Sequence, residues 1–332
     1  TQADQAANCR GLPPFRRSIL VLGLVALAAA ALGLAARYAP VSHHMVLLTS
    51  AISPYLMLAA ALALLLFLLH RRWFLAVVAA ATVIAAIAVE LPLYVAETNG
   101  HPAAVRVRVM TANLYLGQAD PKIVVATAEA NADILALQEL TPGAVQKLSA
   151  AGVDKVFPYR VLDAREEASG TGVWSRFPLK DGRTVTGYWH AMITARAEVE
   201  GAAIDPVLFI THLSGPWPMP LKDWNRDYSR LPGALRDLAK TAGTGCVMVA
   251  GDFNATFDMK PFRRLLEDGY RDAAEQAGAG ITATYPANTW APPVLAIDHV
   301  LTHHCNATSA NTVKLPGSDH RGLMSIVEIP RN

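Results

Sequence analysis

Long apolar runs occupy the first third of the chain, and shorter ones occupy the rest. Ser18 to Ala36 and Met45 to Leu69 contain no charged residue, and Trp73 to Val95 is interrupted only by Glu90. Each run is about as long as a helix must be to cross a bilayer. The pattern predicts three transmembrane helices, at about 18–36, 45–69 and 73–95, with Glu90 at the membrane interface rather than acting as a functional group inside it.

Basic residues flank these runs and predict their orientation. Three arginines precede the first run and two lie between the second and third: Arg10, Arg16, Arg17, Arg71 and Arg72. Because short basic flanks stay in the cytoplasm, we expect residues 1–17 to form a cytoplasmic tail and everything after residue 97 to lie outside. The string from Phe15 to Leu20 is also typical of a twin-arginine export signal, which leads to the same placement.

The pattern changes to short apolar blocks at Ala104, where we expect a soluble domain to begin after a linker at residues 97–103. Asp120 and Pro121 fit the N-cap and the first residue of a helix that follows the first strand. Alternating strand and helix patterns predict one α/β domain over residues 104–332. The blocks typical of strands are Val105 to Leu114, Ile134 to Gln138, Pro206 to Thr211, Val247 to Ala250, Ala296 to Thr302 and Leu323 to Ile329.

Composition, net charge and cysteine content each bear on this picture. Hydrophobic residues make up 52% of the chain and charged residues 17%, which is unusual for a wholly soluble protein. A net charge of +2 gives no strong field, so it neither indicates nor excludes a nucleic-acid partner. The three cysteines lack the spacing of a zinc site. We expect Cys246 and Cys305 to be buried thiols, with a disulfide between them as the less favoured alternative.

Polar clusters lie at the ends of the predicted strands. Because the carboxyl ends of several strands can meet at one edge of a sheet, we expect these side chains to converge on one site. The clusters are Asn113, Gln138 with Glu139, His212, Gly251 to Asn254, Ile297 to Val300 and Ser318 to Arg321.

Six short motifs within these clusters resemble the endonuclease/exonuclease/phosphatase superfamily in type and order. They are Met-Thr-Ala-Asn (110–113), Leu-Gln-Glu (137–139), Thr-His-Leu (211–213), Gly-Asp-Phe-Asn (251–254), Ile-Asp-His-Val-Leu (297–301) and Ser-Asp-His (318–320). The resemblance covers about residues 105–329, and the stretch at 170–176 is similar to a further strand of the family. It implies two mixed sheets packed face to face and flanked by helices, and it implies phosphoester hydrolysis.

The resemblance also implies a metal site. Glu139 is implied as the principal ligand, with Asn113 and Asp319 beside or behind it. Carboxylate and amide oxygens favour hard cations, so the residue types independently predict Mg²⁺ or Mn²⁺ rather than zinc. Such an ion polarises a phosphoryl oxygen and offsets charge on the leaving group.

The remaining motif residues are implied to act on water and phosphate. Asp252 orients and deprotonates the water, and His320, oriented by Asp298, stabilises the phosphoryl charge. Asn254 and His212 contact the phosphate. Either histidine is also a candidate to protonate the leaving group.

Other polar residues are weaker candidates. Arg321 and Ser175 are candidates for phosphate contact, with packing or surface roles as the alternative. His299 alternates to the opposite face of its strand from Asp298, so we expect it to be structural. We expect two further histidine pairs at the surface: His43 with His44, and His303 with His304.

The loop after His212 has the sequence Leu-Ser-Gly-Pro-Trp-Pro-Met-Pro and carries no charge before Lys222. A nuclease is expected to have basic loops with interleaved aromatic residues, so this loop favours a phosphate joined to lipid, with Trp217 as a substrate contact. The alternative is that Trp217 and Met219 pack beneath the loop. Anchoring beside the outer membrane surface keeps the site close to lipid headgroups.

Three spans followed by an outward domain also resemble actinobacterial membrane proteins associated with teicoplanin resistance, as does the His-Leu-x-x-Pro-Trp-Pro pattern of this loop. The resemblance implies a cell-envelope role, such as dephosphorylating an undecaprenyl-pyrophosphate carrier or editing a lipid-linked wall precursor. Three other functions stay open: an outward nuclease, a sphingomyelinase-like phosphodiesterase, and a non-enzymatic module that binds envelope glycopeptides. The complete motif set argues against the last of these.

Overall fold

The computed structural model describes residues 14–97, 104–217 and 219–331. These residues divide into two compact units. The helical unit takes the described residues up to Ala39 together with Leu48–Glu90, and the catalytic unit takes Pro40–Leu47 and the described residues from Leu91 onward. Most of the predicted tail at 1–17 and of the linker at 97–103 lies outside the described residues.

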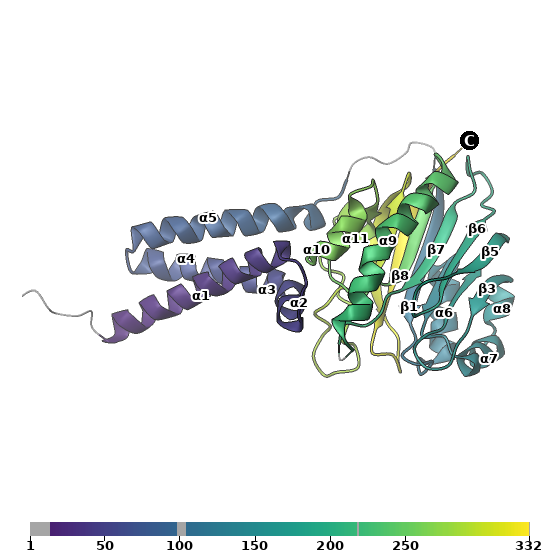
Figure 1. The fold of residues 1–332 in the computed structure, drawn as a ribbon, viewed down its shortest axis with the longest axis horizontal. Helices are drawn as coiled ribbons and strands as arrows, with labels where there is room; N and C mark the ends of the chain where they lie inside the picture. Colours follow the sequence, from purple (N-terminus) through teal and green to yellow (C-terminus); the bar gives the residue numbers. More distant parts are fainter. Residues whose placement is uncertain (1–13, 98–103, 218, 332) are drawn as a thin grey trace, which may run out of the picture. The chain divides into compact units, whose positions relative to one another are not determined.

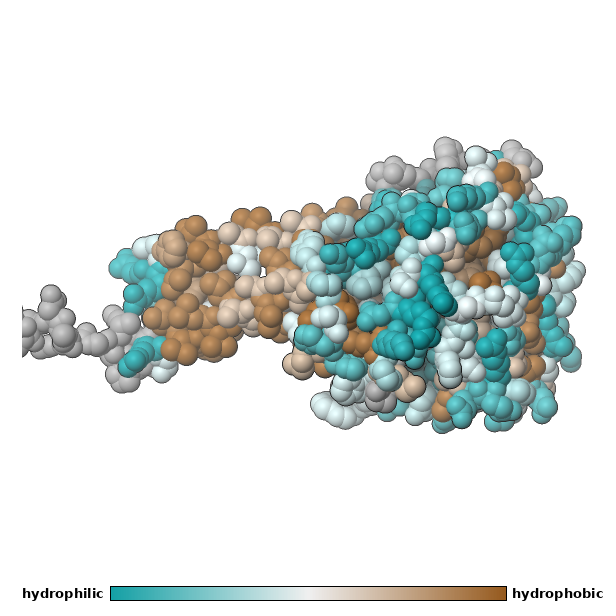
Figure 2. Space-filling view, in the orientation of Figure 1, coloured by the Kyte–Doolittle hydropathy of each residue, from teal (hydrophilic) through white to brown (hydrophobic). Residues whose placement is uncertain are grey.

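Two helices of the N-terminal region are long and apolar enough to cross a membrane: α1, and α5 with the short 3-10 helix η1 that follows it. On the face drawn in Figure 2, the surface of the helical unit is largely hydrophobic, with hydrophilic residues gathered at one end. The helices before the first strand are α1 (Pro14–Tyr38), α2 (His44–Ala51), α3 (Ser53–Met57), α4 (Ala59–Leu69), α5 (Trp73–Glu90) and η1 (Leu91–Tyr94).

The span predicted at 45–69 is not one straight helix. The chain bends by 65° between His44–Ala51 and Ser53–Leu69, so a third span is present only if this bent pair counts as one. Pro54 lies at the break, and its ring displaces the carbonyl group four residues earlier, which interrupts a helix. Within the helical unit, Nη1 of Arg37 lies 3.2 Å from Oε1 of Glu90, an ion pair that the sequence pattern did not predict.

Two six-stranded mixed sheets form the catalytic unit, in the orders β11-β12-β1-β2-β4-β3 and β5-β6-β7-β8-β10-β9. β1 runs parallel to β2, and β7 runs parallel to β8. The strands are β1 (Ala104–Asn113), β2 (Ile134–Gln138), β3 (Tyr159–Asp163), β4 (Thr171–Ser175), β5 (Leu179–Val185), β6 (Met192–Ala197), β7 (Val207–His212), β8 (Val247–Asp252), β9 (Arg271–Asp272), β10 (Asp298–His303), β11 (Asn306–Lys314) and β12 (Arg321–Pro330).

The central strands are buried on both faces, which explains their continuous apolar sequences. In β1, Val109 packs between the two sheets while Met110 packs on the opposite face, against α6. In β2, Ile134 likewise packs between the two sheets, and Leu135 packs on the opposite face. The predicted two-sheet α/β sandwich is therefore present.

Helices cover the outer faces of both sheets. Asp120 caps α6 as predicted, since its Oδ1 accepts a hydrogen bond from the Lys122 amide at 2.9 Å. α9 runs along the sheet that contains β7 and β8 (Figure 1) and buries Trp224 and Leu231. The helices are α6 (Pro121–Asn131), α7 (Pro142–Ala150), α8 (Val153–Val156), α9 (Leu221–Ala242), α10 (Lys260–Arg263), η2 (Arg264–Leu266) and α11 (Ala273–Ala277).

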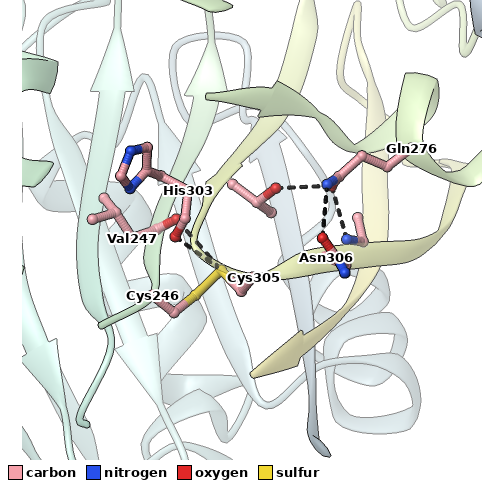
Figure 3. The surroundings of a disulfide bond; sticks show 8 residues. Cys246, Val247, Gln276, His303, Cys305 and Asn306 are labelled. Carbon is pink, nitrogen blue, oxygen red and sulfur yellow. Dashed lines mark hydrogen bonds between the residues drawn. A yellow bond between two sulfur atoms is a disulfide. The ribbon is translucent and has the colours of Figure 1, made fainter. Parts of the chain in front are cut away.

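Cys246 and Cys305 form a disulfide, so the expectation of two buried thiols is wrong (Figure 3). β8 pairs antiparallel with β10, with Val247 opposite His303, and this pairing brings the two cysteines to a Cα separation of 5.3 Å. That separation lies within the range of disulfides. The sequence pattern did not reveal the pairing because β9 and α11 intervene between the two strands along the chain.

Candidate active site

The ends of four strands bring the predicted site residues together. Asn113 ends β1 beside the last residue of β2, and His212 ends β7 beside Asp252, the last residue of β8. Nδ2 of Asn113 donates to Oε1 of Glu139 at 3.1 Å and to Oδ2 of Asp252 at 3.0 Å. One amide group therefore joins carboxylates carried by the two sheets.

Glu139 and Asn254 follow their strands in a left-handed backbone conformation, with φ of 53° and 49°. Asparagine tolerates this conformation, whereas for glutamate it costs roughly 1–2 kcal/mol. The turn aims Glu139 back at the site, where its Oε2 accepts a hydrogen bond from the Leu116 amide at 2.6 Å. Such local strain is typical of functional sites.

His320 lies between three carboxylates. Its Nδ1 is 2.8 Å from Oδ2 of Asp298, while its Nε2 is 3.8 Å from Oδ2 of Asp252 and 4.0 Å from Oδ1 of Asp319. Burial lowers the pKa of His320, but the charges of Asp298 and Asp252 outweigh it and raise this pKa to about 10. The side chain is therefore an imidazolium at neutral pH.

Asp252 lies directly opposite Asp298 in the β8–β10 pairing. Burial raises the pKa of Asp252 to about 7, against the opposing effect of the positive charge on His320. Its Oδ1 accepts a hydrogen bond from the Asn254 amide at 2.8 Å. The carboxylate is thus fixed in position and poised to gain or lose a proton near neutral pH.

Two groupings of acidic residues are candidates for a cation. Asp252, Asp298 and His320 offer ligand atoms within 4.8 Å of one another. Nδ1 of His320 lies 2.8 Å from Asp298, so Nε2 and the carboxylate oxygens are the atoms that this grouping still offers to a cation. The grouping is one candidate metal site.

Glu139 and Asp319 fit a cation better. Burial raises the pKa of Glu139, and the charge of Asp319 adds to that rise. Burial likewise raises the pKa of Asp319, whose Oδ1 is buried with no hydrogen-bond partner among the described residues. Two desolvated carboxylates and the neighbouring Asn113 amide form an oxygen-rich donor set that suits Mg²⁺ or Mn²⁺.

Two site residues were missed by sequence analysis. His190, in the loop before β6, stacks on His212 with ring centroids 4.0 Å apart, and its Nδ1 donates to the Ala168 carbonyl at 3.0 Å. Burial lowers the pKa of both histidines. Tyr285 lies over His320, with ring centroids 5.0 Å apart. Neither residue belongs to a recognisable motif, so only the fold reveals them.

The three weaker candidates for substrate contact have different surroundings in the structure. The Trp217 side chain is exposed and lies edge-on to His44, which contradicts packing beneath the loop. Ser175 is buried, and its Oγ accepts a hydrogen bond from the Phe177 amide, which is a packing role. Arg321 begins β12, and its amide donates to the Thr284 carbonyl.

Four further histidines have positions that the fold explains. His299 is buried between Asp272 and the Ala255 carbonyl, so it is structural as expected. His303 is buried against Tyr270, which contradicts its expected surface position, whereas His43 and His304 are exposed as predicted.

Comparison with known proteins places the motifs in a family. The sequence profile of the Endonuclease/Exonuclease/phosphatase family matches residues 110–320. No curated protein matches the sequence.

Solved structures share the fold at low sequence identity. TDP2 of D. rerio, complexed with a single-strand DNA product, has a TM-score of 0.55 and 19% identity, over 67% of this chain and 98% of that one. An endonuclease/exonuclease/phosphatase from Bacteroides vulgatus has a TM-score of 0.55 and 15% identity, over 68% and 99%. SmcL has a TM-score of 0.50 and 14% identity, over 67% and 98%. At these identities the likeness establishes the fold alone.

Proposed function

Since the chain belongs to the endonuclease/exonuclease/phosphatase family, we propose that it is a divalent-metal-dependent phosphoester hydrolase. The observation that carries the proposal is the placement of His320, held by Asp298 at 2.8 Å and facing Asp252 at 3.8 Å. A fixed positive charge beside a carboxylate of raised pKa combines a site for phosphoryl oxygens with a base for water.

Glu139 and Asp319 would hold Mg²⁺ or Mn²⁺, with Asn113 orienting Glu139 through its hydrogen bond. When bound, such an ion supplies positive charge to a phosphoryl oxygen and to the leaving oxygen. The chain's own part is to keep these two carboxylates together at the end of the sheet that contains β2 and β12, where burial raises the pKa of both.

The remaining residues would act on water and on phosphate. Asp252 accepts the proton of the attacking water, and its Oδ1 is oriented for this by the Asn254 amide. The Nε2–H of His320 donates to a phosphoryl oxygen while Asp298 keeps the ring charged. His212, whose Nε2 lies 3.7 Å from Oδ2 of Asp252, would contact another phosphate oxygen, as would Asn254, whose Nδ2 also donates to the Leu213 carbonyl.

For the substrate, we favour the phosphate or pyrophosphate of a cell-envelope lipid carrier, of the undecaprenyl-pyrophosphate type. The support is the combination of apolar helices in the same chain with an uncharged loop, residues 213–221, directly after His212. The resemblance to membrane proteins associated with teicoplanin resistance agrees with an envelope role in glycopeptide resistance.

We propose that the catalytic unit lies outside the cytoplasm, on a chain that crosses the membrane up to three times. The arginines at the start of α1 and between α4 and α5 favour this orientation. The disulfide between Cys246 and Cys305 supports it, because disulfides persist in oxidising compartments.

A nuclease is the second candidate. One feature favours it: exposed tryptophans near the site offer surfaces on which bases can stack. The loops that carry them contain no Lys or Arg to follow a phosphate backbone, so we place this function second.

A hydrolysis panel with the full chain in lipid nanodiscs tests the assignment. Undecaprenyl pyrophosphate, sphingomyelin and single-stranded DNA are each offered with Mg²⁺ and with chelator. We expect phosphate release from the lipid pyrophosphate, lost in Glu139→Gln and Asp252→Asn. Glu328→Gln is the matched control, because Glu328 pairs with Arg106 and lies roughly 23 Å along β1 from Asn113. Cleavage of DNA alone would replace the lipid assignment with a nuclease.

A further inference from the structure

The exposed tryptophans of the catalytic unit all lie in loops. Of the six tryptophans in the chain, Trp73 begins α5, and Trp174 and Trp224 are buried. The other three are exposed: Trp189 by 68%, Trp217 by 63% and Trp290 by 99%. Large aromatic side chains normally lose water contact on folding, so three exposed ones in one unit need an explanation.

Strand pairing places these three residues at the edge of the sheet that carries the active site. β6 runs antiparallel to β7, so Trp189, just before β6, lies at the end where β7 finishes with His212. Trp217 lies five residues after His212, the last residue of β7. β10 runs antiparallel to β8 and begins opposite Asp252, so the loop of Trp290, which leads into β10, is at the same edge.

The three loops carry no charge. Residues 184–195, 213–221 and 285–297 contain no Asp, Glu, Lys or Arg. Met219 and Val294 add exposed apolar surface to two of them. Tryptophan on an uncharged surface prefers the headgroup level of a bilayer, where its ring is shielded and its N–H group is hydrated.

The chain joins its apolar helices beside two of these loops. Within the catalytic unit, Nε2 of His44 donates to the Pro216 carbonyl at 3.0 Å. Only five residues separate His44 from Tyr38, the last residue of α1.

The connection from α5 into the catalytic unit, through η1, lies near the loop of Trp290. η1 follows α5 without a gap, and the Leu93 carbonyl accepts a hydrogen bond from the Gly280 amide at 2.7 Å. Gly280 lies five residues before the uncharged segment 285–297 begins. Within the catalytic unit, the two segments that continue into the apolar helices therefore contact one of these loops at Pro216 and lie near the start of another at Gly280.

We propose that the loops of Trp189, Trp217 and Trp290 form a docking rim that seats the active-site edge on the bilayer surface. The three segments contain no charged residue, and the nearest charges are Arg165 and Arg230, which donate to the Trp189 and Gly187 carbonyls. Docking on a neutral bilayer therefore depends on the tryptophans and the membrane interface. This inference requires that the apolar helices lie in a membrane, and it is independent of the reaction that the site performs. Docking would bring a headgroup phosphate to the edge where His212 and His320 lie.

Fluorescence quenching by brominated lipid tests the docking rim. The full chain carrying Trp73→Phe is reconstituted in neutral phosphatidylcholine vesicles, with bromine on the upper acyl chain or without it. We expect bromine to quench the emission of this protein equally at 50 and 500 mM NaCl. The additional changes Trp189→Phe, Trp217→Phe and Trp290→Phe should abolish most of the quenching, because only the buried Trp174 and Trp224 then emit.

Tyr159→Trp in that variant provides the matched control. Tyr159 is 41% exposed. It pairs with Ser175 of β4, and Ser175 in turn pairs with the first residue of β2. Tyr159 therefore lies at the opposite end of the strands from Glu139, which follows the last residue of β2. A tryptophan there should emit without quenching. Equal quenching with and without the three rim tryptophans would overturn the docking rim. Quenching by an added oligothymidylate instead of by brominated lipid would also overturn it and would assign the rim to single-stranded nucleic acid.

Discussion

Nδ1 of His320 lies 2.8 Å from Oδ2 of Asp298, which fixes the imidazole ring of a histidine that precedes β12 to the first residue of β10 in the other sheet. This contact keeps the ring positively charged, because both groups are buried and the carboxylate stabilises the proton. The ring also faces Asp252, with Nε2 3.8 Å from Oδ2 of that carboxylate.

The first prediction concerns this pair. Asp298→Asn removes the charge that supports the imidazolium, so we expect kcat on a phosphodiester to fall roughly 100-fold or more, as it should in His320→Gln. Because the two residues act as a unit, the double variant should be no slower than the slower single variant. Steady-state rates of the wild-type protein, the two single variants and the double variant complete a double-mutant cycle, with Glu328→Gln as the control. Independent, multiplying losses would contradict the paired role.

The second prediction concerns metal affinity. Asp319→Asn and Glu139→Gln each remove a carboxylate from the donor set, so the Mg²⁺ concentration for half-maximal activity should rise by at least roughly 10-fold. Calorimetric titration with Mn²⁺ measures the same loss without turnover. If Asp298→Asn weakened Mn²⁺ binding as much as Asp319→Asn does, the ion would belong instead to the grouping of Asp252, Asp298 and His320.

The third prediction concerns pH and stability. Both ring nitrogens of His299 face acceptors, since Nδ1 is 2.7 Å from Oδ2 of Asp272 and Nε2 is 3.0 Å from the Ala255 carbonyl. Burial lowers the pKa of His299, but the charge and hydrogen bond of Asp272 outweigh it, and the folded pKa is raised above 6.5. The stabilisation is therefore fully present below pH 6.5 and is lost as the pH rises through the folded value.

The loss of this stabilisation should appear as a change in the difference between the melting temperatures of the wild-type protein and His299→Gln. The advantage of the wild-type protein over His299→Gln should shrink between pH 6.5 and pH 9. His304→Gln removes an exposed histidine and should show no such trend. A difference between wild type and His299→Gln that is constant with pH would mean that His299 is neutral in the folded protein.

The fourth prediction concerns the disulfide, which closes a loop with a sequence separation of 59 residues. Replacing Cys246 and Cys305 by alanine should lower the free energy of unfolding of the catalytic unit by about 2–4 kcal/mol, because the unfolded chain gains conformational freedom.

The same replacement should leave kcat unchanged at a temperature well below the melting point. Asp252 and Asp298 lie at one end of β8 and β10, and the disulfide lies at the other end of these two strands. Denaturant midpoints and rates measure the two effects separately. A fall in kcat without loss of stability would show that the disulfide positions the site.

The sequence predicted most of the buried strands and the polar residues at their ends, because burial on both faces leaves a continuous apolar block that stops at the site. β6 is also buried but was not predicted. Edge strands carry no such block: β5 is exposed along most of its length and was not predicted. The motif residues converge as expected, since the parallel pairs β1–β2 and β7–β8 end at the same edge.

Features that depend on long-range pairing could not be predicted in this way. The disulfide follows from the pairing of β8 with β10, and the stacking of His190 on His212 follows from the pairing of β6 with β7. The bend at Pro54 could not be predicted from hydropathy, because an apolar run has the same mean hydropathy whether its helix is straight or bent.

The central claim is tested most directly by the rate at which the full chain releases p-nitrophenolate from bis(p-nitrophenyl) phosphate with Mg²⁺, after chelation, and after Mg²⁺ is restored. We predict hydrolysis that stops on chelation and returns with the ion, and that is absent under all three conditions in Glu139→Gln. A rate that is unaffected by chelation, or that is equal in Glu139→Gln, would contradict metal-dependent phosphoester hydrolysis at this site.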